Sequence, residues 1–252
     1  MGVKVDGTRA YLSILPLGFN GGFVGLQIVD VRNPDQPVLL GSFPAQSATW
    51  RLDVVGTRVY LLDWYGIDIL DVSDPAAIRS IKREDSFTFL NNIVVAGERV
   101  YAISDWWVMS TDLDGEDLQA YLLGNDCGGV GLDVVGTLVY AADGRCGLFI
   151  LDASDPTGEG IWREVAHLPI RASDVRVAGG VALVSDSETG AVIAVDVSNP
   201  AQPAIRDRSV IPGWGFDVEV QGDRVFVGGI NNGMQIFKLP FQFTYLPFAR
   251  QQ

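Results

Sequence analysis

One segment of this sequence occurs twice in nearly the same form. Residues 52–60 read Leu-Asp-Val-Val-Gly-Thr-Arg-Val-Tyr, and residues 132–140 read Leu-Asp-Val-Val-Gly-Thr-Leu-Val-Tyr. Weaker copies begin at Val3, Ile93, Val175 and Val218. The glycines of successive copies lie 39 to 49 residues apart, at Gly7, Gly56, Gly97, Gly136, Gly179 and Gly222. A period of this length is typical of solenoids and propellers, in which each repeat is one supersecondary unit.

A second marker follows each glycine with the same period. It is an apolar stretch that ends in an acidic residue, as in Leu-Gln-Ile-Val-Asp at residues 26–30. The terminal positions lie 40 to 44 residues apart, at Asp30, Asp71, Asp112, Asp152, Asp196 and Lys238. Because two independent markers share one period, they indicate six copies of a single structural unit.

Each copy is expected to form four short strands, such as residues 52–55, 59–62, 67–72 and, in the first copy, 38–43. The first three are apolar at most positions, as expected for a sheet that is packed on both faces. The predicted fold class is all-β, a β-propeller of about six four-stranded blades, or seven if the chain is a segment of a longer protein. We expect a single domain over residues 1–252, with approximate blades 1–46, 47–88, 89–127, 128–170, 171–213 and 214–252.

The third strand of several copies resembles the LVIVD repeat. The matching stretches are Gly-Leu-Gln-Ile-Val-Asp-Val at 25–31, Ile-Leu-Asp-Val-Ser-Asp-Pro at 69–75 and Gly-Leu-Phe-Ile-Leu-Asp at 147–152. The third copy lacks the Ser-Asp-Pro turn, and the sixth lacks the terminal Asp. The resemblance implies a propeller fold and an extracellular or cell-surface location, because the family is found mainly in bacterial and archaeal surface or secreted proteins. No signal peptide is recognisable in this chain, and no run of 18 apolar residues could span a membrane.

Most of the repeated residues have a structural interpretation. The Asp that ends each third strand precedes a turn, where it can accept hydrogen bonds from backbone amides. The repeated Gly suits a tight hairpin with positive φ. The repeated aromatic residue is expected to pack between blades, at Tyr11, Tyr60, Tyr101, Tyr140 and Phe226.

A binding site is expected on one face of the propeller. In this fold the first strand of each blade lines a central channel. The loops that precede the first strand, and those between the second and third strands, emerge together on what we call the top face. Here these loops vary, with an insertion at residues 16–23, whereas the turns on the opposite face are uniform. Variable loops on a constant scaffold indicate function.

Two kinds of residue at this top face are candidates for ligand binding. Polar residues begin several first strands, and exposed aromatic residues are favoured at binding sites. Tyr65 and Trp107 map to the same loops, whereas Trp162 does not. We predict a ligand-binding set of Trp50, Arg51, Trp64, Asn92, Trp106, Asp174, Trp214 and Asp217.

Acidic residues also lie where second strands return to this face, at Asp63, Asp105, Asp143 and Asp186. A ring of Asp and Asn could hold a hard cation such as calcium through oxygen ligands. The spacing contains no ligand motif, and Asp is common at strand ends. Apart from this calcium hypothesis, no cofactor is expected.

The two cysteines, Cys127 and Cys146, both map to top-face loops of the fourth blade. A disulfide between them fits this blade model and would indicate an oxidising compartment, and two unpaired thiols are the alternative. The single histidine, His167, maps to an outer strand, away from the channel. The sequence therefore contains no Ser–His or Cys–His pairing near the top face.

The formal net charge of −13 disfavours nucleic acid as a partner. We predict a non-catalytic binding module that engages a protein or a glycan, present as a monomer or as part of a longer chain. One alternative is a carboxylate- or metal-dependent hydrolase or lyase, and another is a structural spacer without a ligand. The fold does not decide among them, because propellers host all three.

Overall fold

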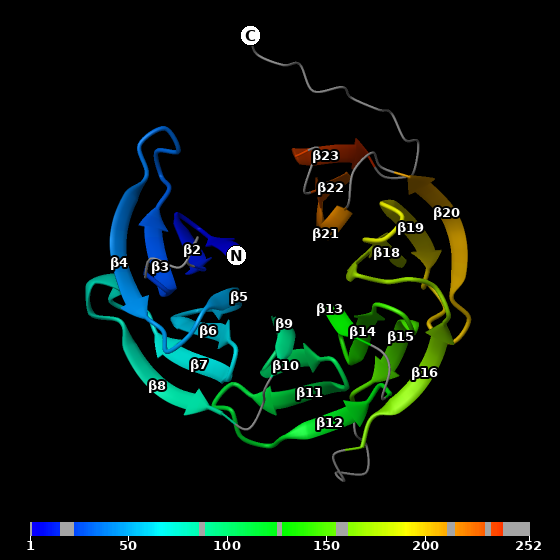
Figure 1. The fold of residues 1–252 in the computed structure, drawn as a ribbon, viewed down its shortest axis with the longest axis horizontal. Coiled ribbons are helices and arrows are strands. Elements are labelled where there is room, and N and C mark those ends of the chain that lie inside the picture. The colour runs from blue at the N-terminus through cyan, green and yellow to red at the C-terminus, as the bar shows by residue number, and fades with distance from the viewer. Residues whose placement is uncertain are drawn as a thin grey trace. The chain divides into compact units, whose positions relative to one another are not determined.

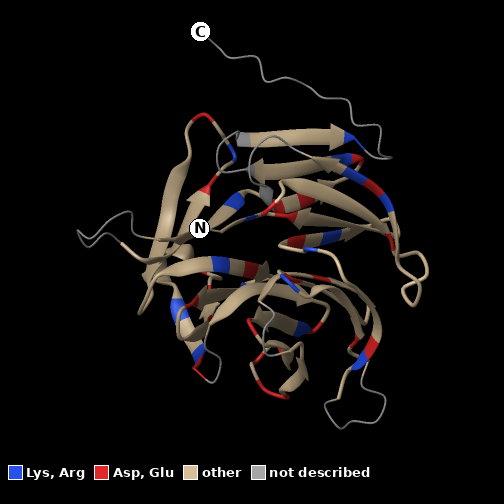
Figure 2. Ribbon diagram, turned by 45° about the vertical axis from the view of Figure 1, so that its right-hand side comes forward, with Lys and Arg blue, Asp and Glu red and all other residues tan. Residues whose placement is uncertain are grey.

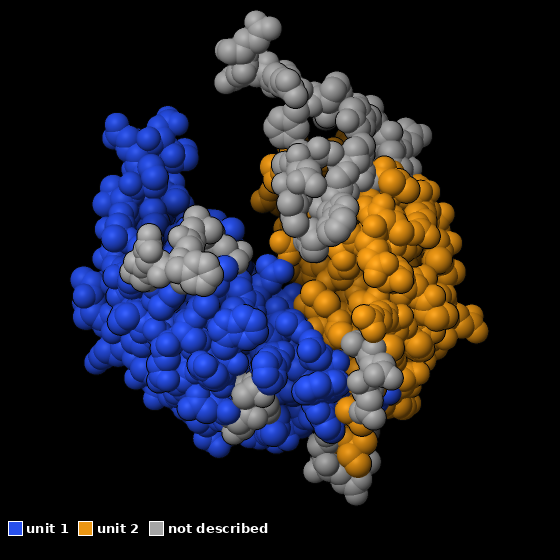
Figure 3. Space-filling model, viewed as in Figure 1, with its two compact units in different colours: residues 1–121 blue, residues 122–252 orange. Residues whose placement is uncertain are grey.

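The computed structural model describes residues 2–15, 23–85, 89–124, 128–154, 161–210, 215–229 and 233–238. The chain divides into two compact units, Met1–Tyr121 and Leu122–Gln252 (Figure 3). Within the described ranges, strands account for nearly all regular structure, and one short 3-10 turn spans Pro75–Ala77. No helix among these residues is long and apolar enough to cross a membrane.

The first unit contains three antiparallel sheets, which we call blades 1 to 3 (Figure 1). In each, the strands follow one another in chain order across the sheet, so every blade is a simple meander. The last residue of β12 belongs to the second unit. The strands are β1 Val3–Asp6, β2 Arg9–Ile14, β3 Gly25–Asp30 and β4 Val38–Pro44; β5 Thr49–Val55, β6 Arg58–Asp63, β7 Gly66–Asp71 and β8 Arg79–Glu84; β9 Leu90–Ala96, β10 Arg99–Ser104, β11 Trp107–Asp112 and β12 Gln119–Leu122.

The second unit contains blades 4 to 6, with the same strand order. Blade 6 has three strands within the described residues. The strands are β13 Gly129–Val135, β14 Leu138–Asp143, β15 Gly147–Asp152 and β16 Arg163–Leu168; β17 Asp174–Ala178, β18 Val181–Asp186, β19 Ala191–Asp196 and β20 Ala204–Val210; β21 Gly215–Gln221, β22 Arg224–Gly229 and β23 Gly233–Lys238. The predicted all-β propeller class is confirmed, and the divergent third copy forms a complete four-stranded blade.

Within each unit, the hydrophobic core consists of layers between neighbouring blades. Tyr11 of blade 1 packs with Leu61 of blade 2, and Tyr60 of blade 2 packs with Val100 of blade 3. In the second unit, Tyr140 lies in the layer between blades 4 and 5. The predicted position of the repeated tyrosine is therefore confirmed at these three sites. Stacked sheets bury both faces, which explains why the first three strands of each copy are so apolar.

Turn chemistry accounts for the two sequence markers. Each repeated hairpin glycine has a φ between 56° and 62°, a region that favours glycine. The Asp that ends the third strand accepts a backbone N–H from the residue two positions later, as in the 2.9 Å bond from Ser73 to Asp71. The same bond occurs at Asp30, Asp112, Asp152 and Asp196. These carboxylates therefore hold turns, as the sequence predicted.

A repeated β-bulge shapes the start of the first strand. The register of β5 with β6 skips Trp50, that of β9 with β10 skips Asn91, and that of β13 with β14 skips Val130. In the sixth blade the skipped position is Phe216. Bulges commonly redirect a side chain next to a functional site. Here they occur beside the first residues of strands that the sequence places at the channel mouth.

A carboxylate also joins neighbouring blades within each unit. Asp133 on β13 accepts N–H bonds from Val134 (2.9 Å) and from Val177 on β17 (2.7 Å). Asp53 makes the equivalent bond to Val95, from blade 2 to blade 3, at 2.7 Å. One oxygen of each carboxylate therefore accepts a hydrogen bond within its own strand, and the other accepts one from the neighbouring blade.

We expect Asp133→Ala to lower the free energy of unfolding by about 1–3 kcal/mol, because it leaves the Val177 N–H without its acceptor. Urea unfolding followed by circular dichroism measures the loss. The matched control is Asp223→Ala, since Asp223 is exposed and its ion pair with Lys238, at 3.2 Å, lies at the surface. That variant should cost less than about 1 kcal/mol. Equal losses in the two variants would contradict the inter-blade role.

Candidate functional site

Among the described residues, five large aromatic side chains on the loops of blades 2 and 3 are exposed. Their exposed fractions are 50% for Trp64, 60% for Tyr65, 52% for Phe89, 45% for Trp106 and 41% for Trp107. Isolated exposed apolar residues are ordinary, but several large rings on adjoining loops of two blades indicate a binding surface. We call these five residues the aromatic surface.

The turns that carry four of these rings are held from beneath by buried polar side chains. Between β6 and β7, Oδ1 of Asp63 accepts the N–H of Tyr65 at 2.8 Å and that of Gly66 at 3.1 Å. Between β10 and β11, Oγ of Ser104 accepts the N–H of Trp107 at 3.0 Å. The rings are therefore presented on ordered turns, which lowers the conformational entropy lost when a ligand binds.

Trp50 links the two blades beneath this surface. Its ring makes an edge-on contact with Trp64, with centroids 4.6 Å apart and an angle of 67° between the planes. Its Nε1 donates to the carbonyl of Leu90 at the start of blade 3, at 3.2 Å. The neighbouring Phe89 has a φ of 59°, which is unusual for a bulky residue and costs energy. The exposed Phe89 is thus held in a strained conformation directly beside the anchor of Trp50.

On the blade 3 side, the Nδ2 of Asn91 donates to Oδ1 of Asp105 at 2.8 Å. Asn91 is the bulged residue of β9, and Asp105 directly precedes Trp106. On the blade 2 side, the N–H of Trp64 donates to Oγ of Ser47 at 3.2 Å. This series of contacts runs from the loop before β5 to the turn after β10. These contacts connect the loops of blade 2 that carry Trp64 with the loops of blade 3 that carry Trp106.

A cluster of three carboxylates and one guanidinium lies below the Trp64 turn. Arg83 on β8 pairs with Asp63 at 2.9 Å, with Asp68 at 2.8 Å and with Asp85 at 2.7 Å. The side chains of Asp63, Asp68 and Arg83 are 0%, 7% and 12% exposed. Burial raises the pKa of Asp68 above its ordinary value, although Arg83 opposes the shift. If all three carboxylates are ionised, Arg83 neutralises one of their negative charges and two remain.

The other predicted binding residues have different environments. Asn92 is buried, and its Oδ1 accepts the N–H of Ile93 at 2.9 Å. Asp174 is also buried and accepts the N–H of Val218 on the next blade at 3.1 Å. Arg51 is half-buried and Asp217 is exposed, whereas Trp214 lies outside the described residues. The structure therefore brings Trp50 and Trp64 into contact, links Trp106 to them through the Asn91–Asp105 bond, and gives Asn92 and Asp174 backbone partners.

The acidic positions proposed as a cation ring also have partners. Asp186 caps its turn by accepting the N–H of Glu188 at 3.1 Å, and Asp143 accepts the N–H of Gly128 at 2.8 Å. Asp63 and Asp105 have the partners given above. Across the described part of the chain, no three His, Cys, Asp or Glu side chains are grouped so that they could hold a metal ion. These contacts favour turn capping, and calcium binding stays a prediction.

Cys146 is disulfide-bonded. The sequence contains one other cysteine, Cys127, which lies outside the described residues. His167 lies on the outer strand β16, where its Nε2 donates to the carbonyl of Cys146 at 2.6 Å and its ring stacks on Phe149 at 4.2 Å. The histidine thus supports the loop of the disulfide-bonded cysteine.

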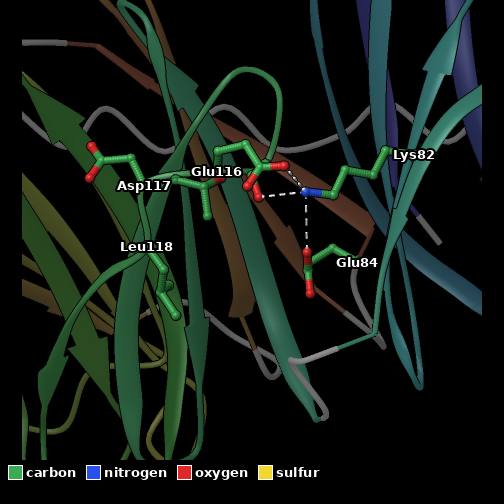
Figure 4. Close-up of a pocket in the computed structure, with 7 residues that line it drawn as sticks. Lys82, Glu84, Glu116, Asp117 and Leu118 are labelled. Atoms are coloured by element: carbon green, nitrogen blue, oxygen red, sulfur yellow. Dashed lines mark hydrogen bonds and ion pairs between the residues drawn. The ribbon is translucent and has the colours of Figure 1, made fainter.

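A small pocket of about 220 Å³ lies in the first unit, between β8 and the turn after β11. Figure 4 shows Lys82 between Glu84 and Glu116, with Asp117 and Leu118 nearby. Nζ of Lys82 pairs with Glu116 at 2.8 Å and donates to the carbonyl of Gly115 at 2.9 Å. The only cation of the lining is thereby engaged with the next blade. We interpret the pocket as an inter-blade contact.

Sequence reasoning missed two parts of the site. Phe89 is in a Phe-Thr-Phe-Leu stretch that resembles the start of a strand, so only its positive φ and exposure identify it. Arg83 is one of several basic residues on outer strands. It is buried beside Asp63 and Asp68, which come from other strands. Acidic and basic positions lie next to one another at many places on the ribbon (Figure 2), so the charge pattern alone does not identify Arg83 as part of the site.

Comparison with known proteins gives one family match. The LVIVD repeat matches residues 21–44, 47–83, 130–159 and 171–208, together just over half of the chain. None of the curated proteins matches the sequence.

Several solved structures share the fold. A functionally unknown protein from Desulfotomaculum acetoxidans has a TM-score of 0.75 at 8% identity, covering 88% of this chain and 75% of that one. A putative 6-phosphogluconolactonase from Bacteroides fragilis has a TM-score of 0.75 at 12% identity, covering 94% and 79%. BamB from Moraxella catarrhalis has a TM-score of 0.67 at 14% identity, covering 98% and 72%. At these identities the similarity concerns the fold alone.

Proposed function

Because this chain belongs to the LVIVD-repeat family of β-propellers, we propose that it is a binding module whose ligand lies on the aromatic surface. The observation that carries this proposal is the set of five exposed rings on loops of blades 2 and 3, four of them on turns held by buried side chains. Tryptophan and tyrosine dominate the energetics of binding sites, because they bury large areas at low entropic cost. Exposed rings of this size also lower solubility, and a ligand-binding role explains why they are exposed.

We further propose that the protein acts at a cell surface or outside the cell. The disulfide bond of Cys146 supports this location, since such bonds persist mainly in oxidising compartments. The proposed ligand classes are a protein and a glycan. The fold similarity to a putative 6-phosphogluconolactonase supports no reaction here. The buried acids described above serve turns and neighbouring strands, which favours binding over carboxylate catalysis.

The proposal is tested by screening the full chain against a displayed random-peptide library and a glycan array. The Trp64→Ala/Trp106→Ala double variant is screened in parallel. A binding module should select defined ligands, and the double variant should bind them at least about thirtyfold more weakly, as hot-spot residues do. Thermal unfolding of both proteins establishes that the variant is folded.

The control is Ile205→Ala, which removes another exposed apolar side chain, 51% exposed, from the outer strand β20. This variant should bind the selected ligands as the unmodified protein does. If the selected ligands bind the double variant with unchanged affinity, the aromatic surface is not the binding site. If no peptide or glycan is selected at all, the spacer interpretation is favoured.

A further inference from the structure

We infer that the aromatic surface binds the cationic side chains of a protein partner, arginine or lysine within an extended segment. This inference rests on the proposed binding function and specifies the chemistry of the ligand. Three observations support it: the type of ring, the carboxylates beneath the rings and the polar groups around them.

The first observation is the composition of the surface. Three of its five rings are tryptophans, Trp64, Trp106 and Trp107, each at least 41% exposed. The face of an aromatic ring is electron-rich and attracts a guanidinium or ammonium group, and the tryptophan ring does so most strongly. The edge-on contact with Trp50 holds the ring of Trp64 in place. A ring that is already oriented loses little freedom when a cation stacks on it.

The second observation is the charge beneath the rings. Asp63, whose Oδ1 holds the turn of Trp64 and Tyr65, is completely buried, and its Oδ2 has no hydrogen-bond partner among the described groups. With Asp68 and Asp85 it shares a single guanidinium, that of Arg83. Asp63 and Asp68 are buried whereas Asp85 is exposed, and buried charge is screened less by water than surface charge is. When these carboxylates are ionised, their excess negative charge favours a cation above the Trp64 turn.

The third observation concerns the polar groups beside the rings. A sugar needs hydrogen-bonding side chains next to the stacking ring, whereas a cation needs only the ring and negative charge. Two polar groups that border this surface in the described part of the chain already have partners: Asn91 with Asp105, and Ser47 with the N–H of Trp64. The net charge of −13 adds long-range attraction for a basic segment. These features favour a basic peptide over a neutral glycan.

The test uses the full chain and two synthetic probes measured by isothermal titration calorimetry. The first is acetyl-Gly-Arg-Gly-Arg-Gly-amide, and the second replaces both arginines with citrulline, which has the same shape without the charge. We expect the arginine peptide to bind and the citrulline peptide to bind at least about tenfold more weakly. Equal affinity for the two peptides would overturn the inference.

Two variants separate cation–π binding from general attraction to an acidic protein. Trp64→Leu and Trp106→Leu keep the charge and an apolar side chain but remove the ring. Each should weaken binding of the arginine peptide by roughly three- to thirtyfold, and the Ile205→Ala control should leave it unchanged. Unchanged binding by both leucine variants would show that only net charge acts. A glycan bound through the tryptophans, with no peptide binding, would refute this inference and leave the proposed binding function standing.

Discussion

Replacing Arg83 with methionine should lower the free energy of unfolding by about 3–5 kcal/mol at neutral pH. Methionine retains most of the apolar volume and removes the charge. Asp63 and Asp68, which are 0% and 7% exposed, would then be left as buried carboxylates without their cation. Removing one partner of a buried ion pair is costly because the other charge stays desolvated.

The loss should depend on pH in a defined direction. Burial already raises the pKa of Asp68, and removing Arg83 takes away the group that opposes this rise. A carboxyl group with a raised pKa in the folded state favours folding in its protonated form. Its contribution is fully present below the unfolded-state pKa, about 3.9, and is lost as pH rises through the folded-state pKa. The deficit of Arg83→Met should therefore be smaller near pH 4.5 than at pH 7.5.

The matched control is Arg79→Met in the same strand. Arg79 is 75% exposed and pairs with Asp71 at 2.9 Å, so its removal should cost less than about 1 kcal/mol at either pH. Urea unfolding at the two pH values measures both variants. A loss for Arg83→Met as small as that of the control would mean that water reaches the cluster, and would weaken the electrostatic argument for a cationic ligand.

Reduction of the disulfide should have the second large effect. If Cys146 pairs with Cys127, as predicted from the sequence, the bond closes a loop of about 20 residues and stabilises the protein by about 3 kcal/mol. For a chain of this size, that loss lowers the melting temperature by roughly 6–12 °C. Calorimetry with and without a reducing agent measures the shift.

The variant Cys146→Ser provides the control. It should melt at the lower temperature without a reducing agent and should not respond to one. Peptide mapping under non-reducing conditions identifies the partner of Cys146. Finding Cys127 as a free thiol would show the predicted pairing to be wrong.

The candidate site was only partly predictable from the sequence. Trp50, Trp64 and Trp106 were predicted because the repeat places them in top-face loops. In the structure Trp50 contacts Trp64, and the bond from Asn91 to Asp105 reaches the turn of Trp106. Asn92 and Asp174 were predicted on the same ground, but each accepts a backbone N–H while buried. A sequence shows which residues enter a strand. It does not show whether a carboxylate faces solvent or a neighbouring strand more than 40 residues away, as Asp174 and Val218 illustrate.

By itself, the sequence determined the six repeats, their strands and their turns. Apolar alternation at a fixed period, with glycine and aspartate at the turns, is local information, and sheets of this composition bury both faces only by stacking. Tertiary structure alone decided where the bulges lie, which carboxylates join blades, and how Arg83 comes to lie among three acids. The bonds between blades and the pairing of Arg83 with Asp63 and Asp68 depend on contacts between residues that lie far apart in the chain, and burial and hydrogen bonding set the energies of such contacts.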